Sequence, residues 1–201
     1  MSDLSAHRIW AIILAAGISS RMGSPKLALP WGKHTMLEET TDQVLGAGYE
    51  GAVVVLGEAR EILEPLLADR PVKTARNLNF RSGLSSSIKA GVAFVDSDAT
   101  AFALVPADQP LVTTRMHQLV LAHFRRNGKG ICAPKFEGVV GYPVIFSAKY
   151  RSEMFALQGD HGARGLLDLH KDDVSVFEVK YPEVIASINT PRDYDEHRPQ
   201  A

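Results

Sequence analysis

The chain has 201 residues, of which 45% are hydrophobic and 22% charged, and this suits one globular domain with a sizeable core. Its 22 lysines and arginines against 23 aspartates and glutamates give a formal net charge of -1 at pH 7, which argues against nucleic acid as a partner because phosphate binding usually requires a basic excess. Cys132 is the only cysteine, so an intramolecular disulfide and zinc sites with several thiolate ligands are excluded, and a reducing compartment is expected.

The first predicted element is the apolar run from Ile9 to Ala16, directly after Arg8. It is far shorter than the about 20 residues that a membrane-spanning helix needs. Asp3 lies where a secretory signal would carry positive charge, and the run leads into a polar loop. We therefore predict a buried strand over Ile9–Leu14, and we expect a cytoplasmic protein with no membrane or nucleic-acid partner.

Strands and helices are predicted to alternate along the rest of the chain. Apolar runs rich in β-branched residues predict strands at Gly51–Leu56, Ala101–Pro106, Ile131–Pro134, Tyr142–Phe146 and Val174–Val179. Helical spacing predicts helices from a capping box at Thr35–Glu38 to about Leu45, over Leu84–Val95, and through Met116, Leu119, Val120 and Phe124. This alternation predicts an α/β fold with a mostly parallel sheet, helices on both faces, and ligand binding at the carboxyl ends of the strands.

The segment Gly46–Gly51 matches the dinucleotide-binding pattern GxGxxG, but it is in the wrong place for that function. The pattern must follow a strand and open a helix, whereas here it closes a helix and precedes a strand. We interpret these glycines as a helix end and a turn.

The loop after the first strand, Leu14 to Lys26, is a candidate anion site. Gly17 lets a ligand approach the backbone, and Gly23 and Pro25 shape the return of the chain. Between Asp3 and Glu38 the sequence contains no carboxylate, and four cations lie in that interval: Arg8, Arg21, Lys26 and Lys33. An ordinary turn with solvated cations is the alternative.

A second stretch without acidic residues runs from 70 to 95. It contains basic side chains together with short polar ones, among them Asn79, Ser85 and Ser86. Near a helix start such groups would hydrogen-bond a nucleobase or a sugar, and the helix amides favour an anion. The alternative is a capped helix whose serines satisfy its own backbone.

Asp108 is a candidate metal ligand, because a hydrophobic strand delivers this carboxylate at its carboxyl end. Mg²⁺ often takes only one or two protein ligands and completes its shell with water and phosphate oxygens. A turn-forming aspartate is the alternative. The lone Cys132 has no histidine close to it in the sequence, so we interpret it as a small buried residue.

Taken together, these segments resemble the nucleotidyltransferases of molybdenum cofactor maturation, the MobA-like NTP transferases. Residues 14–26 match the signature LAAGxSxRMGxxK at every fixed position, and Pro106–Pro110 is similar to the metal-binding segment of the family. Gly141–Pro143 and Gly159–Arg164 resemble acceptor-side segments of the cytidylyltransferase branch, which is the closest branch. The resemblance extends to Pro191 and implies a single domain over 1–201, a Rossmann-like three-layer sandwich of the nucleotide-diphospho-sugar transferase type.

The resemblance also implies roles for individual residues. It puts Leu14, Ala15, Ala16 and Gly17 around the nucleotide, Arg21 on the triphosphate and Lys26 near the α-phosphate, and Lys26, Arg21 and Asp108 then form the catalytic set. Asp108 and Asn189 become the metal ligands, although this chain reads Ser187-Ile188-Asn189 where the cytidylyl branch often reads Asp-x-Asp. The acceptor would meet Gly141, Tyr142, Pro143, Asp160 and Arg164, with Tyr142 where His is commoner.

The implied reaction is transfer of CMP from CTP to the phosphate of molybdopterin with release of pyrophosphate, dependent on Mg²⁺ or alternatively Mn²⁺. The attacking phosphate is already anionic near neutral pH, so no protein base is needed, and catalysis is positioning and charge stabilisation. Implied partners are a nucleoside triphosphate, with CTP favoured, the molybdopterin cofactor, and a molybdoenzyme or its chaperone in transient contact. The alternatives are guanylyl transfer, transfer to another phosphorylated small molecule, and a nucleotide-binding cofactor chaperone without catalysis.

Overall fold

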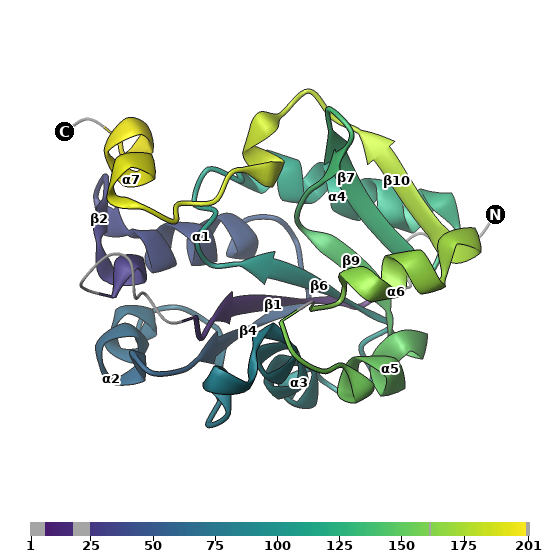
Figure 1. Cartoon of the computed structure of the whole chain (residues 1–201), viewed down its shortest axis with the longest axis horizontal. Coiled ribbons are helices and arrows are strands. Elements are labelled where there is room, and N and C mark those ends of the chain that lie inside the picture. The colour runs from purple at the N-terminus through teal and green to yellow at the C-terminus, as the bar shows by residue number, and fades with distance from the viewer. Residues whose placement is uncertain (1–6, 18–24, 161, 200–201) are drawn as a thin grey trace.

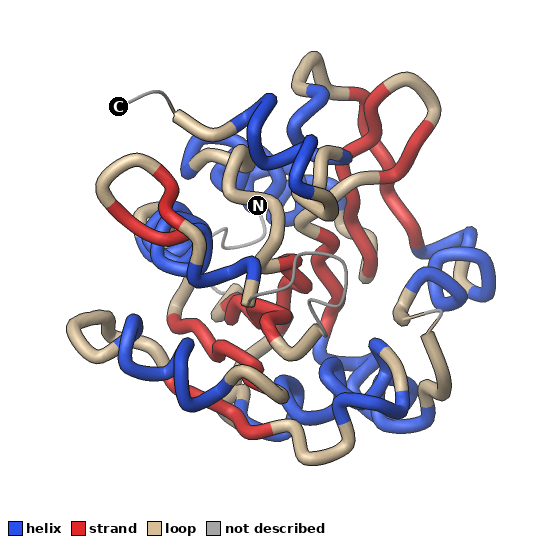
Figure 2. Tube along the Cα trace, turned by 60° about the vertical axis from the view of Figure 1, so that its left-hand side comes forward, coloured by secondary structure: helices blue, strands red, loops and turns tan. Residues whose placement is uncertain are grey.

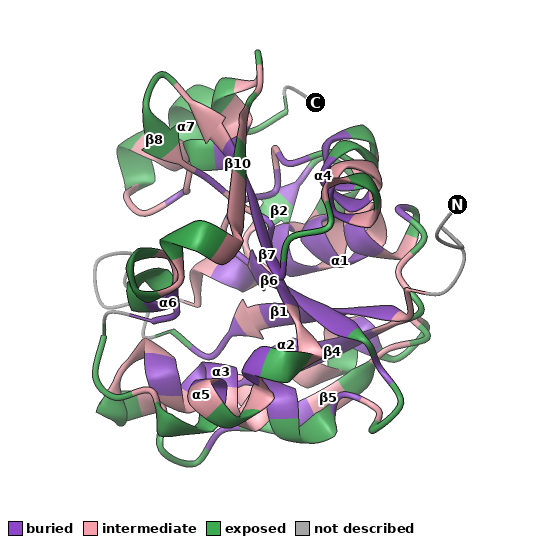
Figure 3. Cartoon of the chain, turned by 90° about the vertical axis from the view of Figure 1, so that its right-hand side faces the viewer, coloured by how far each residue is buried: buried purple, intermediate pink, exposed green. Residues whose placement is uncertain are grey.

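A central β-sheet with helices on both faces forms the body of the protein (Figures 1 and 2). The structure is a computed structural model and describes residues 7–17, 25–160 and 162–199. Strands in the middle of the sheet are buried, whereas the outward faces of the helices are exposed (Figure 3). The α/β fold with a mostly parallel sheet and helices on both faces, predicted from the alternation of strands and helices, is therefore confirmed.

The main sheet has eight strands in the order β10-β7-β9-β6-β1-β4-β5, with β8 paired to β7. Along that path only β9 is antiparallel to its neighbours, β6 and β7. The strands are β1 (Ile9–Ala15), β4 (Gly51–Leu56), β5 (Lys73–Arg76), β6 (Ala101–Pro106), β7 (Ile131–Phe136), β8 (Val139–Val140), β9 (Val144–Ser147) and β10 (Val174–Glu178). A separate hairpin pairs β2 (Pro30–Trp31) with β3 (His34–Thr35).

Seven α-helices are described, and several short 3₁₀ helices join them. They are α1 (Met36–Leu45), α2 (Arg60–Leu63), α3 (Leu84–Phe94), α4 (Thr114–Asn127), α5 (Arg151–Ala156), α6 (Arg164–Leu169) and α7 (Pro191–His197). The 3₁₀ helices are η1 (Lys26–Ala28), η2 (Glu64–Leu67), η3 (Phe80–Ser82), η4 (Ala148–Tyr150), η5 (Lys171–Asp173) and η6 (Pro182–Ile185). None of the helices in the described ranges is long and apolar enough to cross a membrane.

The alternating side chains of β1 bind the two helical layers to the sheet. Ile12 packs in the cluster that contains Ile88 and Val92 of α3, whereas Ile13 packs in the cluster that contains Leu37 and Val44 of α1. Helix α3 lies very close to the sheet, because a Cβ on Gly91 would come within 2.3 Å of Ile12. Successive strand residues point to opposite faces, so one continuous apolar strand supports both layers.

The local signals predicted several elements well. Helix α1 begins with the expected capping box, in which the Thr35 hydroxyl accepts from the Glu38 amide and the Glu38 carboxylate accepts from the Thr35 amide. The glycines after α1 end the helix and turn the chain, with Gly48 at φ +89°. Strand β5 was not predicted, because it is a short edge strand whose only buried residue is Ala75.

The order of the strands places a crevice between β1 and β6. The chain passes from β1 to β4 and β5 on one side of β1, and then returns to form β6 on the other side. At such a switch point the connections leave in opposite directions, and ligands of open α/β sheets bind there, at the carboxyl ends of the strands. The carboxyl ends of β1 and β6 lie side by side at this edge, where the Ala107 amide donates to the Leu14 carbonyl at 3.2 Å.

Candidate active site

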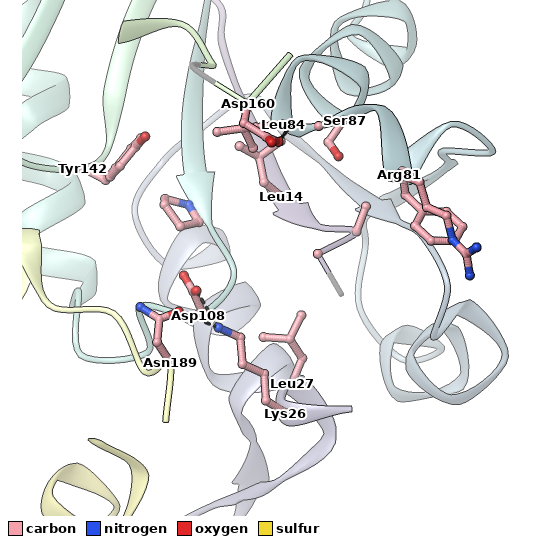
Figure 4. A pocket seen from close by; sticks show the side chains of 15 residues that line it. Leu14, Lys26, Leu27, Arg81, Leu84, Ser87, Asp108, Tyr142, Asp160 and Asn189 are labelled. Carbon is pink, nitrogen blue, oxygen red and sulfur yellow. Dashed lines mark hydrogen bonds and ion pairs between the residues drawn. The ribbon is translucent and has the colours of Figure 1, made fainter. Parts of the chain in front are cut away.

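A cavity of about 520 Å³ opens at the carboxyl ends of β1 and β6 (Figure 4). Its volume lies in the range of about 300–1,000 Å³ that is usual for small-ligand sites. The residues that line it are Leu14, Ala16, Gly17, Lys26, Leu27, Phe80, Arg81, Gly83, Leu84, Ser87, Pro106, Asp108, Tyr142, Asp160 and Asn189. The cavity thus occupies the crevice predicted from the strand order.

Two segments far apart in the sequence converge on the Lys26 ammonium group. Its Nζ lies 2.7 Å from Asp108 Oδ2, 2.8 Å from the Ile188 carbonyl oxygen and 3.1 Å from Asn189 Oδ1. The Lys26 and Asp108 side chains are only 16% and 23% exposed, so water screens this ion pair less than it would a surface pair. The predicted catalytic lysine and the two predicted metal ligands therefore lie together.

The oxygens around the Lys26 ammonium also suit a divalent cation. Carboxylate, amide and carbonyl oxygens are ligands for Mg²⁺, and here one of each kind converges on a single cationic atom. Within residues 7–17, 25–160 and 162–199 no group of three or more His, Cys, Asp and Glu side chains gathers as a metal cluster. A metal at this place would take Asp108 as its charged protein ligand and Asn189 as a neutral one, and phosphate and water oxygens would complete its shell.

The Asn189 segment is also fixed from its C-terminal side by the cap of α7. Asp193 Oδ2 accepts from the backbone amides of Asn189 at 2.9 Å and Thr190 at 2.8 Å, and the Thr190 hydroxyl accepts from the Asp193 amide in return. The pKa of the Asp193 carboxyl is lowered, first by the Asn189 amide and then by the bonds to Thr190. The backbone on both sides of the Asn189 side chain therefore has defined partners.

On the opposite side of the cavity from Lys26 lies the start of α3 (Figure 4). Gly83 has φ +92°, and a Cβ there would come within 2.5 Å of Asp160 Oδ1, so this turn needs glycine. The Asp160 carboxylate accepts from the Leu84 amide at 3.2 Å and so caps the helix from a distant segment. A carboxylate at a helix N-terminus disfavours a second anion there, so phosphates are expected on the Lys26 side.

Two of the three residues predicted from the stretch 70 to 95, which has no acidic residues, lie on α3, but none of the three lines this cavity. Asn79, Ser85 and Ser86 line a separate depression between α3 and the segment 157–159. Leu84 and Ser87 line the main cavity instead, and sequence reasoning missed both. Residues three apart at the start of a helix share a face, so this spacing was the signal that could have found them.

The predicted acceptor residues divide into two groups. Tyr142 and Asp160 line the main cavity, and with Arg164 they line an adjoining cavity of about 560 Å³. Gly141 lines only a small cavity of about 20 Å³, and a Cβ there would approach the Val184 carbonyl oxygen within 2.5 Å. Pro143 is buried and lines none of the described cavities. Tyr142, Asp160 and Arg164 are therefore the predicted acceptor residues that line the main or the adjoining cavity.

The interval between Asp3 and Glu38, which contains no carboxylate, is not a uniform anion site. Arg8 lies at the amino end of β1, away from the cavity, where it pairs with Glu50 at 3.1 Å and with Asp98. Lys33 is exposed in the β2–β3 hairpin and does not line the cavity. Arg21 lies outside the described residues. Sequence proximity therefore overestimated the number of cations at the site.

Other predicted residues have simpler positions. Leu14, Ala16 and Gly17 line the cavity, whereas Ala15 is buried among hydrophobic residues on the other face of β1. Arg81 is one of the basic side chains in the stretch from 70 to 95 and lines the cavity wall, but its guanidinium pairs with Glu58 at 3.1 Å and points away from Lys26 (Figure 4). Cys132 is fully buried, and burial raises the pKa of its thiol to about 12, which confirms the interpretation as a small buried residue.

A comparison with protein families matches residues 11–174 to a model described as the MobA-like NTP transferase domain. Among curated proteins, the chain is 28% identical to the molybdenum cofactor cytidylyltransferase of Escherichia coli K12, over 91% of this chain and 92% of that protein. It is 29% identical to the nicotine blue oxidoreductase of Paenarthrobacter nicotinovorans, over 83% of this chain and 85% of that protein.

The fold is similar to that of Rv0371c from Mycobacterium tuberculosis. That structure has a TM-score of 0.85 at 27% sequence identity and covers 96% of this chain and 98% of its own. A manganese complex of the same protein has a TM-score of 0.81 at 25% identity, covering 94% of this chain and 97% of that one. These similarities span both sides of the cavity, because the matched length includes nearly all of the sheet.

Proposed function

We propose that the chain, which belongs to the MobA-like NTP transferase family, transfers CMP from CTP to the phosphate of the molybdopterin cofactor and releases pyrophosphate. The chain is an enzyme of the nucleotidyltransferase class, and its relatives connect it with nucleotidyl transfer in molybdenum cofactor biosynthesis. CTP as donor, molybdopterin as acceptor and a single catalytic domain over 1–201 are the specific parts of this proposal.

The observation that carries the proposal is the convergence of Lys26, Asp108 and Asn189 on one side of a cavity whose opposite wall is the start of α3. The triphosphate would lie toward Lys26 and Asp108, where an ammonium group and the metal-binding oxygens lie together. The nucleoside would lie between Leu14 and the Leu84–Ser87 wall. The acceptor would enter from the adjoining cavity beside Tyr142, with Arg164 close to its anionic groups.

The chemistry needs charge stabilisation more than proton transfer. An oxygen of the acceptor phosphate attacks the α-phosphorus of CTP, a new phosphoanhydride bond forms, and the bond to the β-phosphate oxygen breaks to release pyrophosphate. The attacking oxygen already carries negative charge near neutral pH, so the site does not require a general base. Lys26 would orient the α-phosphate and stabilise the charge that develops there in the transition state.

Asp108 and Asn189 would hold a divalent ion in this proposal. When bound, such an ion supplies positive charge for the phosphate oxygens and fixes their geometry. Mg²⁺ is the proposed ion because the ligands are oxygens and few in number, and Mn²⁺ is the alternative, supported by the manganese complex of the similar mycobacterial protein.

The preference for CTP is supported by Gly159–Arg164, which resembles the cytidylyl branch, and by the named activity of the Escherichia coli relative. The cytoplasm as the place of action and transient contact with a molybdoenzyme or its chaperone also belong to the proposal, because the product must reach an apoenzyme.

The deciding experiment incubates the purified protein with Mg²⁺, molybdopterin and each of CTP, GTP, ATP and UTP, and measures pyrophosphate and the mass of the product. The expected result is pyrophosphate release with CTP and a product heavier than molybdopterin by one CMP unit. A GMP adduct would indicate guanylyl transfer, and binding of nucleotide without pyrophosphate would indicate a chaperone. No adduct with molybdopterin, but turnover with another phosphorylated compound, would change the acceptor.

A further inference from the structure

The residue after Asp108 has an unusual environment. Gln109 is only 3% exposed and is not among the residues that line the cavity. Its Nε2 donates to the Ser187 hydroxyl oxygen at 3.1 Å, while its Oε1 is buried without a partner among the described residues. A buried amide with one half unsatisfied is costly, and an apolar side chain of similar size would avoid that cost. The polar side chain therefore calls for an explanation beyond packing.

The Gln109–Ser187 bond joins the two segments that carry the proposed metal ligands. Asp108 precedes Gln109 by one residue, and Asn189 follows Ser187 by two. Between them, the Ile188 amide donates to the Asp108 carbonyl oxygen at 2.9 Å. The two segments are thus joined by a backbone bond and, one residue after Asp108 and one residue before Ile188, by a side-chain bond.

Fixed geometry matters particularly for Asn189. Its amide oxygen is a neutral ligand, so it attracts a cation less strongly than a carboxylate would. A weak ligand contributes most when its oxygen already lies at the binding distance, because no ordering is then required on binding. Asp193 fixes the backbone after Ile188 through the amides of Asn189 and Thr190. On the other side the segment is held by the Ile188 amide and by Ser187, and of these two contacts only the Ser187 hydroxyl is a side-chain contact.

We propose that Gln109 is a positioning residue for the metal site: through its bond to Ser187 it sets the separation of the Asp108 and Asn189 oxygens. It touches neither substrate nor metal. The inference rests on the proposed function, because it assumes that these two oxygens bind the divalent ion. Outer hydrogen bonds of this kind orient metal ligands, and their loss typically lowers metal affinity.

The test measures binding of Mn²⁺ alone by electron paramagnetic resonance, without nucleotide, and thermal unfolding of each variant. The variants are Gln109→Ala, Ser187→Ala, the double variant and Ser187→Thr, which keeps the hydroxyl. The matched control is Gln43→Ala, which removes a glutamine whose Oε1 accepts from the Thr114 amide at 2.7 Å, at the α1–α4 junction. Asp108→Asn is measured alongside them.

The expected result is that Gln109→Ala and Ser187→Ala each weaken Mn²⁺ binding by about 10-fold or more. The double variant should bind Mn²⁺ at least as tightly as the single variant with the lower Mn²⁺ affinity, because both changes remove the same bond. Ser187→Thr should stay within about twofold of the unchanged protein, and so should Gln43→Ala even if it unfolds at a lower temperature. A purely structural role of Gln109 would lower the unfolding temperature without moving Mn²⁺ affinity.

Two outcomes separate this inference from the proposed function. If Asp108→Asn abolishes Mn²⁺ binding while Ser187→Ala and Gln109→Ala bind as well as the unchanged protein, the positioning role is wrong and the metal site stands. If Asp108→Asn binds Mn²⁺ normally, the metal site itself is wrong. Should Gln109→Ala fail to fold, the comparison of Ser187→Ala with Ser187→Thr decides, because Ser187 is only partly buried.

Discussion

The Lys26 ammonium and the Asp108 carboxylate form an ion pair at 2.7 Å across 82 positions of the sequence. The same ammonium lies 3.1 Å from Asn189 Oδ1, so it contacts both side-chain oxygens proposed to bind the metal. Two cations at one pair of oxygens repel each other, so a divalent ion that binds there must move the ammonium aside. The displaced Lys26 would then be available to the phosphates of the nucleotide.

Lys26→Met should tighten the binding of Mn²⁺ measured without nucleotide, because the variant lacks the competing ammonium. At the same time kcat should fall by about 10²–10³, the effect of removing one preorganised charge-stabilising group. Electron paramagnetic resonance gives the first quantity and pyrophosphate release the second. Lys33→Met, at an exposed position away from the cavity, should change neither. Weaker Mn²⁺ binding in Lys26→Met would contradict the competition.

Asp108→Ala should lower turnover by about 10²–10³ or more with the fold intact, because it removes the only carboxylate proposed to bind the metal. Circular dichroism checks the fold, and initial rates across a Mg²⁺ titration check the activity. Asp98→Ala is the matched control, since that carboxylate pairs with Arg8 away from the cavity. Near-normal turnover of Asp108→Ala at any Mg²⁺ concentration would show that Asp108 does not anchor the ion.

CTP should exceed GTP in kcat/KM by at least about tenfold, which corresponds to roughly 1.4 kcal/mol. A site shaped for one base leaves buried polar groups unpaired when the other base binds, at about 1–3 kcal/mol for each group. Competition between the two nucleotides in one reaction, followed by product mass, measures the ratio directly. Equal incorporation of GMP would assign the enzyme to guanylyl transfer.

Arg164→Ala should raise KM for molybdopterin and leave the dissociation constant of CTP unchanged. Arg164 lines the adjoining cavity with Tyr142 and Asp160 but does not line the main cavity, so its charge would act on the acceptor. Calorimetry with CTP and initial rates with varied acceptor separate the two effects. Arg192→Ala, an exposed arginine on α7, serves as control. Loss of CTP affinity in Arg164→Ala would place the nucleotide differently.

Stability should fall as the pH drops from about 6.5 towards 4 because of His117. This side chain is fully buried, its Nδ1 lies 3.1 Å from the Tyr49 hydroxyl, and burial lowers its pKa from 6.5 to about 4. The unfolded chain therefore binds a proton in that window and the folded protein does not, so protonation favours unfolding. From above pH 6.5 to below pH 4, this effect lowers the free energy of unfolding by about 3 kcal/mol in all.

The measurement is urea unfolding between pH 4 and 7 for the unchanged protein and for His117→Gln. Carboxylates titrate in the lower part of this window in both proteins, so the difference between the two curves isolates the imidazole. The stability of the unchanged protein should fall more steeply than that of His117→Gln as the pH drops from about 6.5 to 4. Parallel curves over the whole range would show that His117 titrates alike in the folded and unfolded states.

Much of the fold followed from short-range patterns. Strands β4 and β6 begin and end where the apolar runs predicted, and α1 begins at the predicted capping box. These features depend on residues within about four positions of one another, and helix and strand periodicities operate over that distance. The edge strand β5 was missed because it pairs on one side only and buries a single residue.

Which residues form the site depends on contacts between distant parts of the sequence, and short-range patterns do not predict such contacts. The sequence alone identified Lys26, Asp108 and Asn189 through separate segments and a family resemblance, but only the tertiary structure brought their side chains to one ammonium group. The tertiary structure also shows that Asp160 caps the start of α3 and that Arg8 lies at the opposite end of β1 from the cavity. Asn79, Ser85 and Ser86 line a separate depression and not the main cavity. The physical reason is that strand order and the packing of loops at a sheet edge are set by the burial of the whole core, whereas charge and spacing along the chain report only on neighbouring residues.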